Sequence, residues 1–252
     1  MSPCRSRTCL RRSYSLPSRQ PDFLWTWRVW CGDRLPVPIP QVEWIGQDPR
    51  FAAYRKLQGV AFDPNSYRRA SVRDRDELAD SLAGFLAAMH TALSPTEIAT
   101  IGIPGPDRRP VNLSIADVPA EAQRAVEKII HDFEAVWVDD QVEGPQVPVH
   151  HDFHCANMVL DAPAGRLVGV WDFSNVQTSN GAFDLCYLAN LDLVRRVARA
   201  YEATTRVGLD VQAAMIAHYF ETICDYILRD QQAELPRITR QWTRHLDAKP
   251  SL

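Results

Sequence analysis

The residues best suited to chemistry lie in one short polar stretch, residues 150–157, and a little beyond it. Asp152 is followed by Asn157 after four intervening residues, and Asp172 comes fifteen residues after Asn157. Phosphoryl transfer needs a carboxylate that positions the attacking hydroxyl and accepts its proton. It also needs oxygen ligands for the magnesium ions that neutralise the phosphates. Asp152 has the right side chain for the first task, and Asn157 and Asp172 for the second.

A predicted hairpin would bring Asn157 and Asp172 together. Residues 158–160 and 167–171 are short apolar runs, and the segment 161–166 between them contains proline and glycine. This pattern predicts two antiparallel strands joined by a turn. Asn157 would lie just before the first strand and Asp172 at the end of the second, so the two oxygen ligands would meet at one end of a rigid ribbon.

Patterning elsewhere predicts a mainly helical chain. Two strands are expected at 42–45 and 51–54, around a turn at 46–49 that contains glycine and proline. Apolar residues at helical spacing predict a helix over 74–93. The segment 94–118 is expected to be a loop. Further helices are expected over 119–138, 184–205, 209–230 and 233–246.

The composition sets limits on the class of protein. The chain has 252 residues, of which 46% are hydrophobic and 23% charged, as in ordinary globular proteins. A net charge of −3 gives no electrostatic support for a nucleic-acid partner. No apolar run approaches the roughly 20 residues needed to cross a membrane. The six cysteines contain no C-x-x-C pair, which favours reduced thiols and a cytoplasmic protein.

Three motifs in order resemble the aminoglycoside phosphotransferase family, which includes choline-kinase and homoserine-kinase-like relatives. The family loop H-G-D-h-H-x-x-N, where h is hydrophobic, is matched by residues 150–157, except that His151 stands where glycine is usual. A hydrophobic pair followed by D-[FW] matches residues 170–173, and a D-L-A-like helix start matches residues 184–186. The resemblance spans about residues 35–230.

The resemblance implies a role for individual residues. Asp152 would be the catalytic base, and Asn157 and Asp172 would bind Mg²⁺. The backbone at Arg55 and Leu57 would be the hinge that hydrogen-bonds the base of ATP or GTP. Separately, Asp184 would be a structural carboxylate that steadies the loop.

The same resemblance implies an α+β, protein-kinase-like two-lobed fold, with a mostly helical C-terminal lobe and a reduced β N-terminal lobe. Before Leu35 the sequence has no lysine and no glutamate, and Gly32 is its only glycine. A glycine-rich loop, a strand lysine and a helix glutamate are therefore all missing. We expect an atypical segment over 1–34, either disordered or misassigned, a remnant of the nucleotide-binding lobe and hinge over 35–60, and a helical lobe with the catalytic loop over 61–252.

The expected function is transfer of the γ-phosphoryl group of ATP or GTP to a hydroxyl of a small molecule, aminoglycoside-like or another amino alcohol. The incomplete first lobe would impair it. A catalytically inactive kinase-like fragment that acts as a binding module is the alternative. A zinc hydrolase using His150, His151 and His154 is a third hypothesis, although the spacing matches neither H-E-x-x-H nor a zinc finger. A protein kinase is disfavoured because residues 172–184 are too few for an activation segment and lack A-P-E. The oligomeric state is left open.

Overall fold

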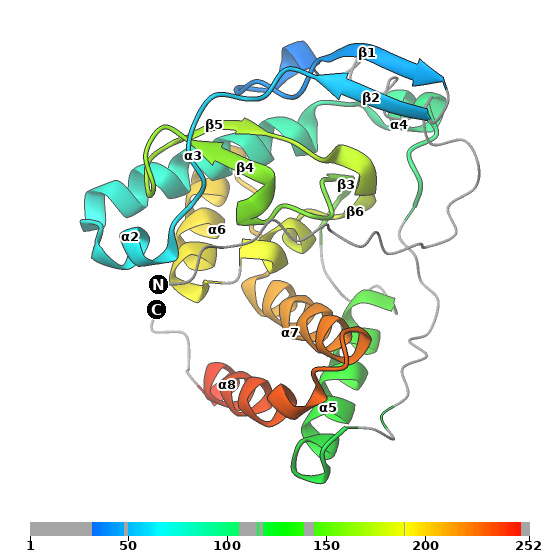
Figure 1. The fold of residues 1–252 in the computed structure, drawn as a ribbon, viewed down its shortest axis with the longest axis vertical. Coiled ribbons are helices and arrows are strands. Elements are labelled where there is room, and N and C mark those ends of the chain that lie inside the picture. Colours follow the sequence, from blue (N-terminus) through cyan, green and yellow to red (C-terminus); the bar gives the residue numbers. More distant parts are fainter. Residues whose placement is uncertain are drawn as a thin grey trace.

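The computed structural model describes residues 32–47, 50–105, 115, 118–138, 144–188 and 190–247. It shows a chain dominated by helices, with short strand pairs toward one end (Figure 1). The longer helices are α3 (Val72–Thr91), α5 (Ala120–Phe133), α6 (Leu191–Thr205), α7 (Val211–Leu228) and α8 (Leu235–Asp247). Residues 1–31 lie outside the described part, so the structure does not test most of the prediction made for 1–34.

The strands form antiparallel pairs, three of them in the described residues. β1 (Val42–Gln47) pairs with β2 (Arg50–Tyr54), as the sequence predicts, and β4 (Met158–Leu160) pairs with β5 (Leu167–Val170) in the predicted hairpin. β3 (Gln146–Val149) pairs with β6 (Gln177–Asn180). We did not expect this third pair, because Pro148 and the polar run in β6 are poor strand signals.

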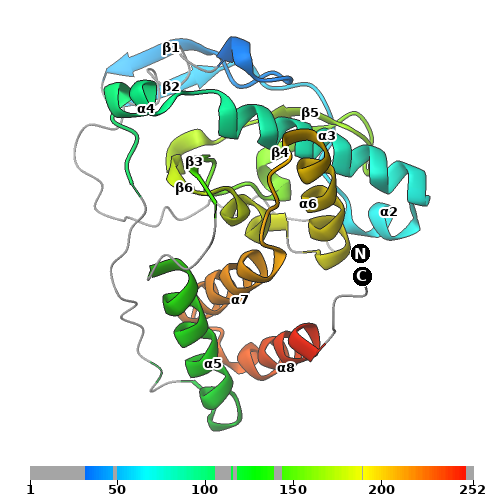
Figure 2. The ribbon, with the colours of Figure 1, turned by 180° about the vertical axis from the view of Figure 1, so that it is seen from behind.

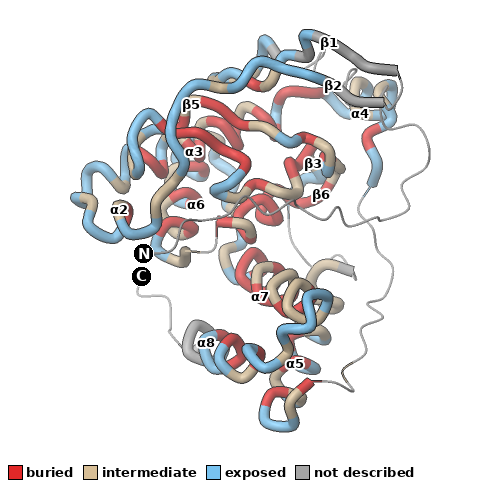
Figure 3. Tube along the Cα trace, in the orientation of Figure 1, coloured by how far each residue is buried: buried red, intermediate tan, exposed pale blue. Residues whose placement is uncertain are grey.

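Helix α3 is the centre of the core. It begins at a capping box in which Ser71 and Asp74 bond each other's backbone, which satisfies amide groups that a helix start leaves unpaired. The apolar positions that predicted the helix are all buried, and α3 packs along α6. They are Leu78, Leu82, Phe85, Leu86 and Met89. Buried positions concentrate on α3, on the β4–β5 hairpin and on the inner faces of α6 and α7 (Figure 3).

At the end of the molecule away from β1 and β2, α5, α7 and α8 pack against one another (Figure 2). α5 continues into η2 (Glu134–Val138), a single π-helical turn, and together they cover the predicted 119–138 helix. No helix among the described residues is long and apolar enough to cross a membrane.

Two expectations about helices were wrong. The predicted loop 94–118 contains α4 (Pro95–Ile101), which begins with Ser94 and Glu97 in a capping box, a signal readable in the sequence as S-x-x-E. The predicted helix 184–205 is two elements, because η5 (Gly181–Leu188) is a 3₁₀ segment and α6 starts afresh at the N-cap Asn190. A short helix, α2 (Pro64–Arg69), was also not expected.

Candidate active site

The polar stretch 150–157 forms a loop between β3 and β4, and the Asp184 side chain bonds its backbone. The Asp184 carboxylate accepts hydrogen bonds from the backbone N–H groups of His150, at 3.0 Å, and His151, at 2.9 Å. Its Oδ2 atom also lies 3.2 Å from Nε2 of His90, a residue of α3. Asp184 is fully buried in η5. It therefore anchors the start of the loop, as the family resemblance implies.

The surroundings of Asp184 keep it ionised. Burial alone raises the pKa of this carboxyl, but the hydrogen bond and charge of His90, together with His150 and the His151 amide, hold the pKa below its ordinary value. With Nε2–H of His90 donating to Asp184, Nδ1 accepts from the Tyr201 hydroxyl at 3.0 Å. Burial raises the pKa of Tyr201 to about 12. The sequence did not single out His90 or Tyr201 for this chain of contacts.

Asp152 lies in the middle of the loop with its side chain one-quarter exposed. Its Oδ2 accepts a hydrogen bond from Nδ2 of Asn157 at 3.0 Å, and Oδ1 lies 3.2 Å from Nε2 of His154. Burial raises the pKa of Asp152 against the lowering effects of His154, His150 and the Asn157 bond. A partly exposed carboxyl with a raised pKa is a better proton acceptor than an ordinary aspartate.

Asn157 and Asp172 lie at the same end of the β4–β5 hairpin. Asn157 immediately precedes β4, Asp172 follows β5 by one residue, and the backbone N–H of Trp171 donates to the Asn157 carbonyl at 2.9 Å. Asn157 is buried, while Asp172 is exposed and has a left-handed backbone with φ of 59°. Ser174 Oγ donates to Oδ1 of Asp172 at 2.6 Å. The structure thus joins Asp152 and Asn157 by a hydrogen bond and places Asp172 at the same end of the hairpin as Asn157.

The oxygen atoms here fit magnesium. Mg²⁺ in phosphate-binding sites takes one or two protein carboxylates and completes its shell with waters and phosphate oxygens. Asp172 offers a carboxylate, and Oδ1 of Asn157 offers an amide oxygen. Among the described residues there is no group of three or more His, Cys, Asp or Glu side chains suited to a metal.

The three loop histidines have different partners, which gives no support to a zinc site. His150 is buried, and its Nε2–H donates to the carbonyl of Trp171 at 2.9 Å. Burial lowers the pKa of His150, so it is neutral. His151 stacks on Phe183 with ring centroids 4.5 Å apart. His154 faces Asp152.

His151 has a backbone φ of 59°, in the left-handed region that favours glycine. The family usually has glycine at this position, and the structure shows why. A residue with a side chain pays about 1–2 kcal/mol for this conformation. The stacking on Phe183 partly offsets that strain.

The predicted hinge runs beside the hairpin. Val60 and Leu160 bond each other's backbone, at 2.8 and 2.9 Å, and Leu57 lies over Gly169 of β5. The Arg55 guanidinium is exposed and pairs with Glu43 of β1 at 2.8 Å. The segment 55–60 therefore connects β2 to the hairpin whose end carries Asn157 and Asp172.

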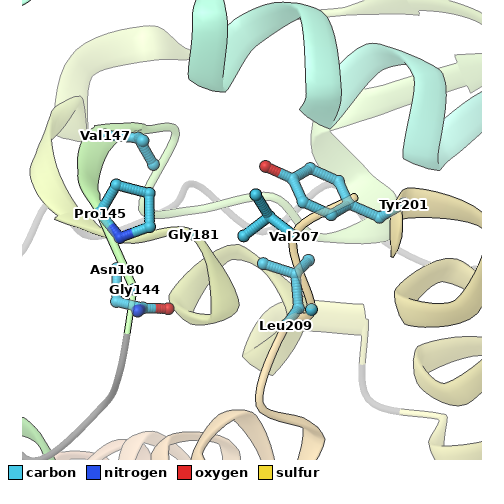
Figure 4. Close-up of a pocket in the computed structure, with 9 residues that line it drawn as sticks. Gly144, Pro145, Val147, Asn180, Gly181, Tyr201, Val207 and Leu209 are labelled. Carbon is cyan, nitrogen blue, oxygen red and sulfur yellow. The ribbon is translucent and has the colours of Figure 1, made fainter. Parts of the chain in front are cut away.

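Of the hollows among the described residues, two can be outlined, and neither is lined by Asp152, Asn157 or Asp172. One is an open depression on α6 lined by Arg199, Glu202, Ala203 and Arg206. The other, between β3, β6 and the segment before α7, has a volume of about 10 Å³ (Figure 4). Tyr201 and Leu209 point toward it. It has room for about one water molecule, so it is no substrate site.

The helical lobe, the short strand pairs and the loop anchored by a buried aspartate define a protein-kinase-like phosphotransferase fold. Comparison with known proteins gives the family. The model of the phosphotransferase enzyme family matches residues 25–222, so the chain belongs to that family. A search of the curated proteins gives no match.

Solved structures with the same fold include aminoglycoside and macrolide phosphotransferases. Wild-type aminoglycoside 2'-phosphotransferase-IIIa in complex with GDP has a TM-score of 0.67 at 17% identity, over 89% of this chain and 83% of its own. A ternary complex of streptomycin, ATP and APH(2")-IIa has 0.56 at 18%, over 86% and 79%. The apoenzyme of macrolide 2'-phosphotransferase MphH from Brachybacterium faecium has 0.57 at 16%, also over 86% and 79%. The two-lobed kinase-like fold predicted from the sequence is confirmed.

Proposed function

We propose that this protein transfers the γ-phosphoryl group of ATP or GTP to a hydroxyl group of a small molecule. The observation that carries the proposal is the hydrogen-bonded link between Asp152 and Asn157, at the end of the hairpin that also carries Asp172. Membership of the phosphotransferase family supports it. Because its co-substrate is a cellular nucleotide, we place its action in the cytoplasm.

In this proposal Asp152 is the catalytic base. Its carboxylate positions the acceptor hydroxyl and takes the proton as the hydroxyl oxygen bonds to the γ-phosphorus. The bond from that phosphorus to the bridging oxygen breaks, and the nucleoside diphosphate leaves with the bridging oxygen. Asn157 and Asp172 would hold Mg²⁺, which neutralises phosphate charge when bound. The backbone at Arg55 and Leu57 would bond the nucleotide base.

The acceptor we propose is an aminoglycoside-like molecule or another amino alcohol. Structures similar to this chain are described as complexes with kanamycin, streptomycin and gentamicin. Glu221 and Asp225 lie one helical turn apart on α7 and could attract a cationic acceptor. Asp225, however, pairs with Arg229 at 2.9 Å, which lowers the net negative charge of that face.

The direct test is phosphotransfer by the full chain. The purified protein is incubated with Mg²⁺, with ATP or GTP, and with panels of aminoglycosides, macrolides and simple amino alcohols, and phosphoester formation is followed by ³¹P NMR. We expect one acceptor class to be phosphorylated, and Asp152→Asn to lower the rate by about 10²–10⁴-fold. Equal rates for the wild type and Asp152→Asn would overturn the role of Asp152.

A second candidate is a catalytically inactive kinase-like fragment that acts as a binding module. It is favoured by the sequence itself, in which Lys56 is the first lysine and lies at the hinge rather than on a strand facing the phosphates. Loss of one positively charged group that stabilises the phosphates in the transition state lowers the rate of phosphotransfer by about 10²–10³-fold. Nucleotide binding with no phosphoester from any acceptor would support this candidate.

A further inference from the structure

Trp171 uses all of its polar groups on the two ends of the loop 150–157. Its carbonyl accepts from Nε2 of His150 at 2.9 Å, at the start of the loop. Its backbone N–H donates to the Asn157 carbonyl at 2.9 Å, and its indole Nε1–H donates to Oδ1 of Asn157 at 3.1 Å, at the loop's end. A tryptophan at this strand end therefore contacts the loop by its side chain as well as by its backbone.

The side-chain amide of Asn157 is held on both sides. Its Nδ2 group donates to the carbonyl oxygen of Asp152 at 2.9 Å and to Oδ2 of the same residue at 3.0 Å. Its Oδ1 atom accepts from the Trp171 indole. An amide oxygen has two lone pairs, so one remains for a cation.

These contacts permit one orientation of the amide. Turned by 180°, the amide would place its N–H groups against the indole N–H of Trp171, and its oxygen against the Asp152 carboxylate. Donor would then face donor and acceptor would face acceptor, in a residue that is only 6% exposed and so has little water to compensate. Of these contacts, the hydrogen bond from the Trp171 indole is the one made to Oδ1 of Asn157.

We propose that Trp171 is a positioning residue for the cation that accompanies the nucleotide. Its indole N–H fixes the amide of Asn157 so that Oδ1 presents its second lone pair to Mg²⁺. This inference rests on the proposed function, because it assumes that Asn157 is a ligand. Partners of this kind, which touch a ligand rather than the metal, are worth about 10–100-fold in metal affinity or activity.

Removing the indole N–H tests the inference through metal binding rather than turnover. Binding of a non-hydrolysable ATP or GTP analogue to the full chain is measured by isothermal titration calorimetry, with and without saturating Mg²⁺. The dissociation constant measured without Mg²⁺, divided by the one measured with Mg²⁺, reports how much the metal strengthens nucleotide binding. We expect Trp171→Phe to lower this ratio about 10-fold or more and to leave binding without Mg²⁺ unchanged.

Trp137→Phe is the matched control. Trp137 is also half-buried and also donates its indole N–H, at 3.1 Å, but to the Ala213 carbonyl. We expect this variant to keep the wild-type ratio. A merely structural defect in Trp171→Phe would weaken nucleotide binding equally with and without Mg²⁺, and that result would overturn the inference.

Two further results keep the proposal separable from the function on which it rests. If the wild type shows no Mg²⁺-dependent nucleotide binding, the proposed function itself fails. If the wild type shows Mg²⁺-dependent binding and Trp171→Phe shows the same ratio, only the role of Trp171 fails.

Should Trp171→Phe not fold, site-specific replacement of Trp171 by benzothienylalanine keeps the ring shape and puts sulfur in place of the N–H. The same drop in the ratio is expected, and an unchanged ratio would contradict the inference.

Discussion

At the scale of single residues, two aspartates close to one loop have opposite environments. Asp184 receives donors from His90, His150 and His151, and its pKa is lowered. Asp152 has fewer donors, and burial raises its pKa. The first environment favours a permanently charged anchor and the second a carboxylate that can take up a proton. The two pKa values shift in opposite directions because the hydrogen-bond donors differ, not because the residue type does.

The pH dependence of transfer should report Asp152. Because its pKa is raised above the ordinary value of 3.8, the carboxyl group of Asp152 stays protonated to a higher pH than that of an ordinary aspartate. We therefore expect kcat/KM to begin falling, as the pH is lowered, at a higher pH than an ordinary aspartate would give. The charge of His154 lowers this pKa. We therefore expect His154→Gln to move the acid limb to higher pH. Rates measured in buffers of constant ionic strength check this, and a shift to lower pH would contradict it.

The left-handed backbone of His151 gives a second prediction at this scale. We expect His151→Gly to be more stable than His151→Ala by about 1 kcal/mol, because both lack the ring stacked on Phe183 and only alanine is strained at φ of 59°. At an ordinary backbone position alanine is instead the more stable, by about 0.5–1 kcal/mol. Urea unfolding of the two variants decides, and alanine proving the more stable would refute the strain.

At the scale of elements, the site depends on contact between the hinge segment and the hairpin. Gly59 has a φ of 142°, and a Cβ atom there would lie 2.7 Å from the carbonyl oxygen of Leu160 and 2.9 Å from Cβ of Val159. Val60, the next residue, forms two backbone hydrogen bonds with Leu160. Only glycine allows the segment 55–60 to approach β4 so closely. This contact sets the position of the hinge relative to Asn157.

Enlarging Gly59 should therefore disturb both stability and nucleotide binding. We expect Gly59→Ala to lower the free energy of unfolding by about 1–3 kcal/mol and to weaken binding of the nucleotide. Gly84→Ala is the control, because its Cβ would meet nothing within 4 Å in the middle of α3. It should stabilise by about 0.5–1 kcal/mol. Denaturant unfolding and calorimetry measure both variants, and equal effects would contradict the close-approach argument.

At the scale of the whole molecule, the reduced first lobe and the helical second lobe have different roles in the proposed function. β1 and β2 lie at one end, and α5, α7 and α8 lie at the other (Figure 1). The helical lobe carries every residue we assign to proton transfer and metal binding. In the proposed function the nucleotide would in addition contact the hinge at Arg55 and Leu57, so its binding tests whether the two parts act together.

Thermal unfolding with Mg²⁺ and nucleotide provides that test. A ligand that binds only the folded protein at 100 times its Kd stabilises it by about 2.7 kcal/mol. We expect a clear rise in Tm with Mg²⁺ and ATP or GTP, and a smaller one when Asp172→Ala removes a ligand of the metal. No rise at millimolar nucleotide would show that the first lobe is too incomplete to bind it, and would overturn the transferase hypothesis in favour of an inactive module that binds another ligand.

The local sequence determined much of the architecture. Apolar periodicity gave α3, α7 and α8, and turn residues between apolar runs gave the β4–β5 hairpin, since each depends on neighbours within a few turns or strands. The hairpin pattern was enough to predict that Asn157 and Asp172 lie at the same end of β4 and β5, because a hairpin brings its two ends together whatever surrounds it. The roles of these residues remain predictions.

Only the tertiary structure decided which groups support that site. The pairing of β3 with β6, the contact of His90 with Asp184 across 94 positions of sequence, and the indole bond from Trp171 to Asn157 have no local signature. A buried polar atom takes whichever donor the packing places within about 3 Å. Periodicity along the chain reports which face of an element is buried, but not which side chain of another element will face it.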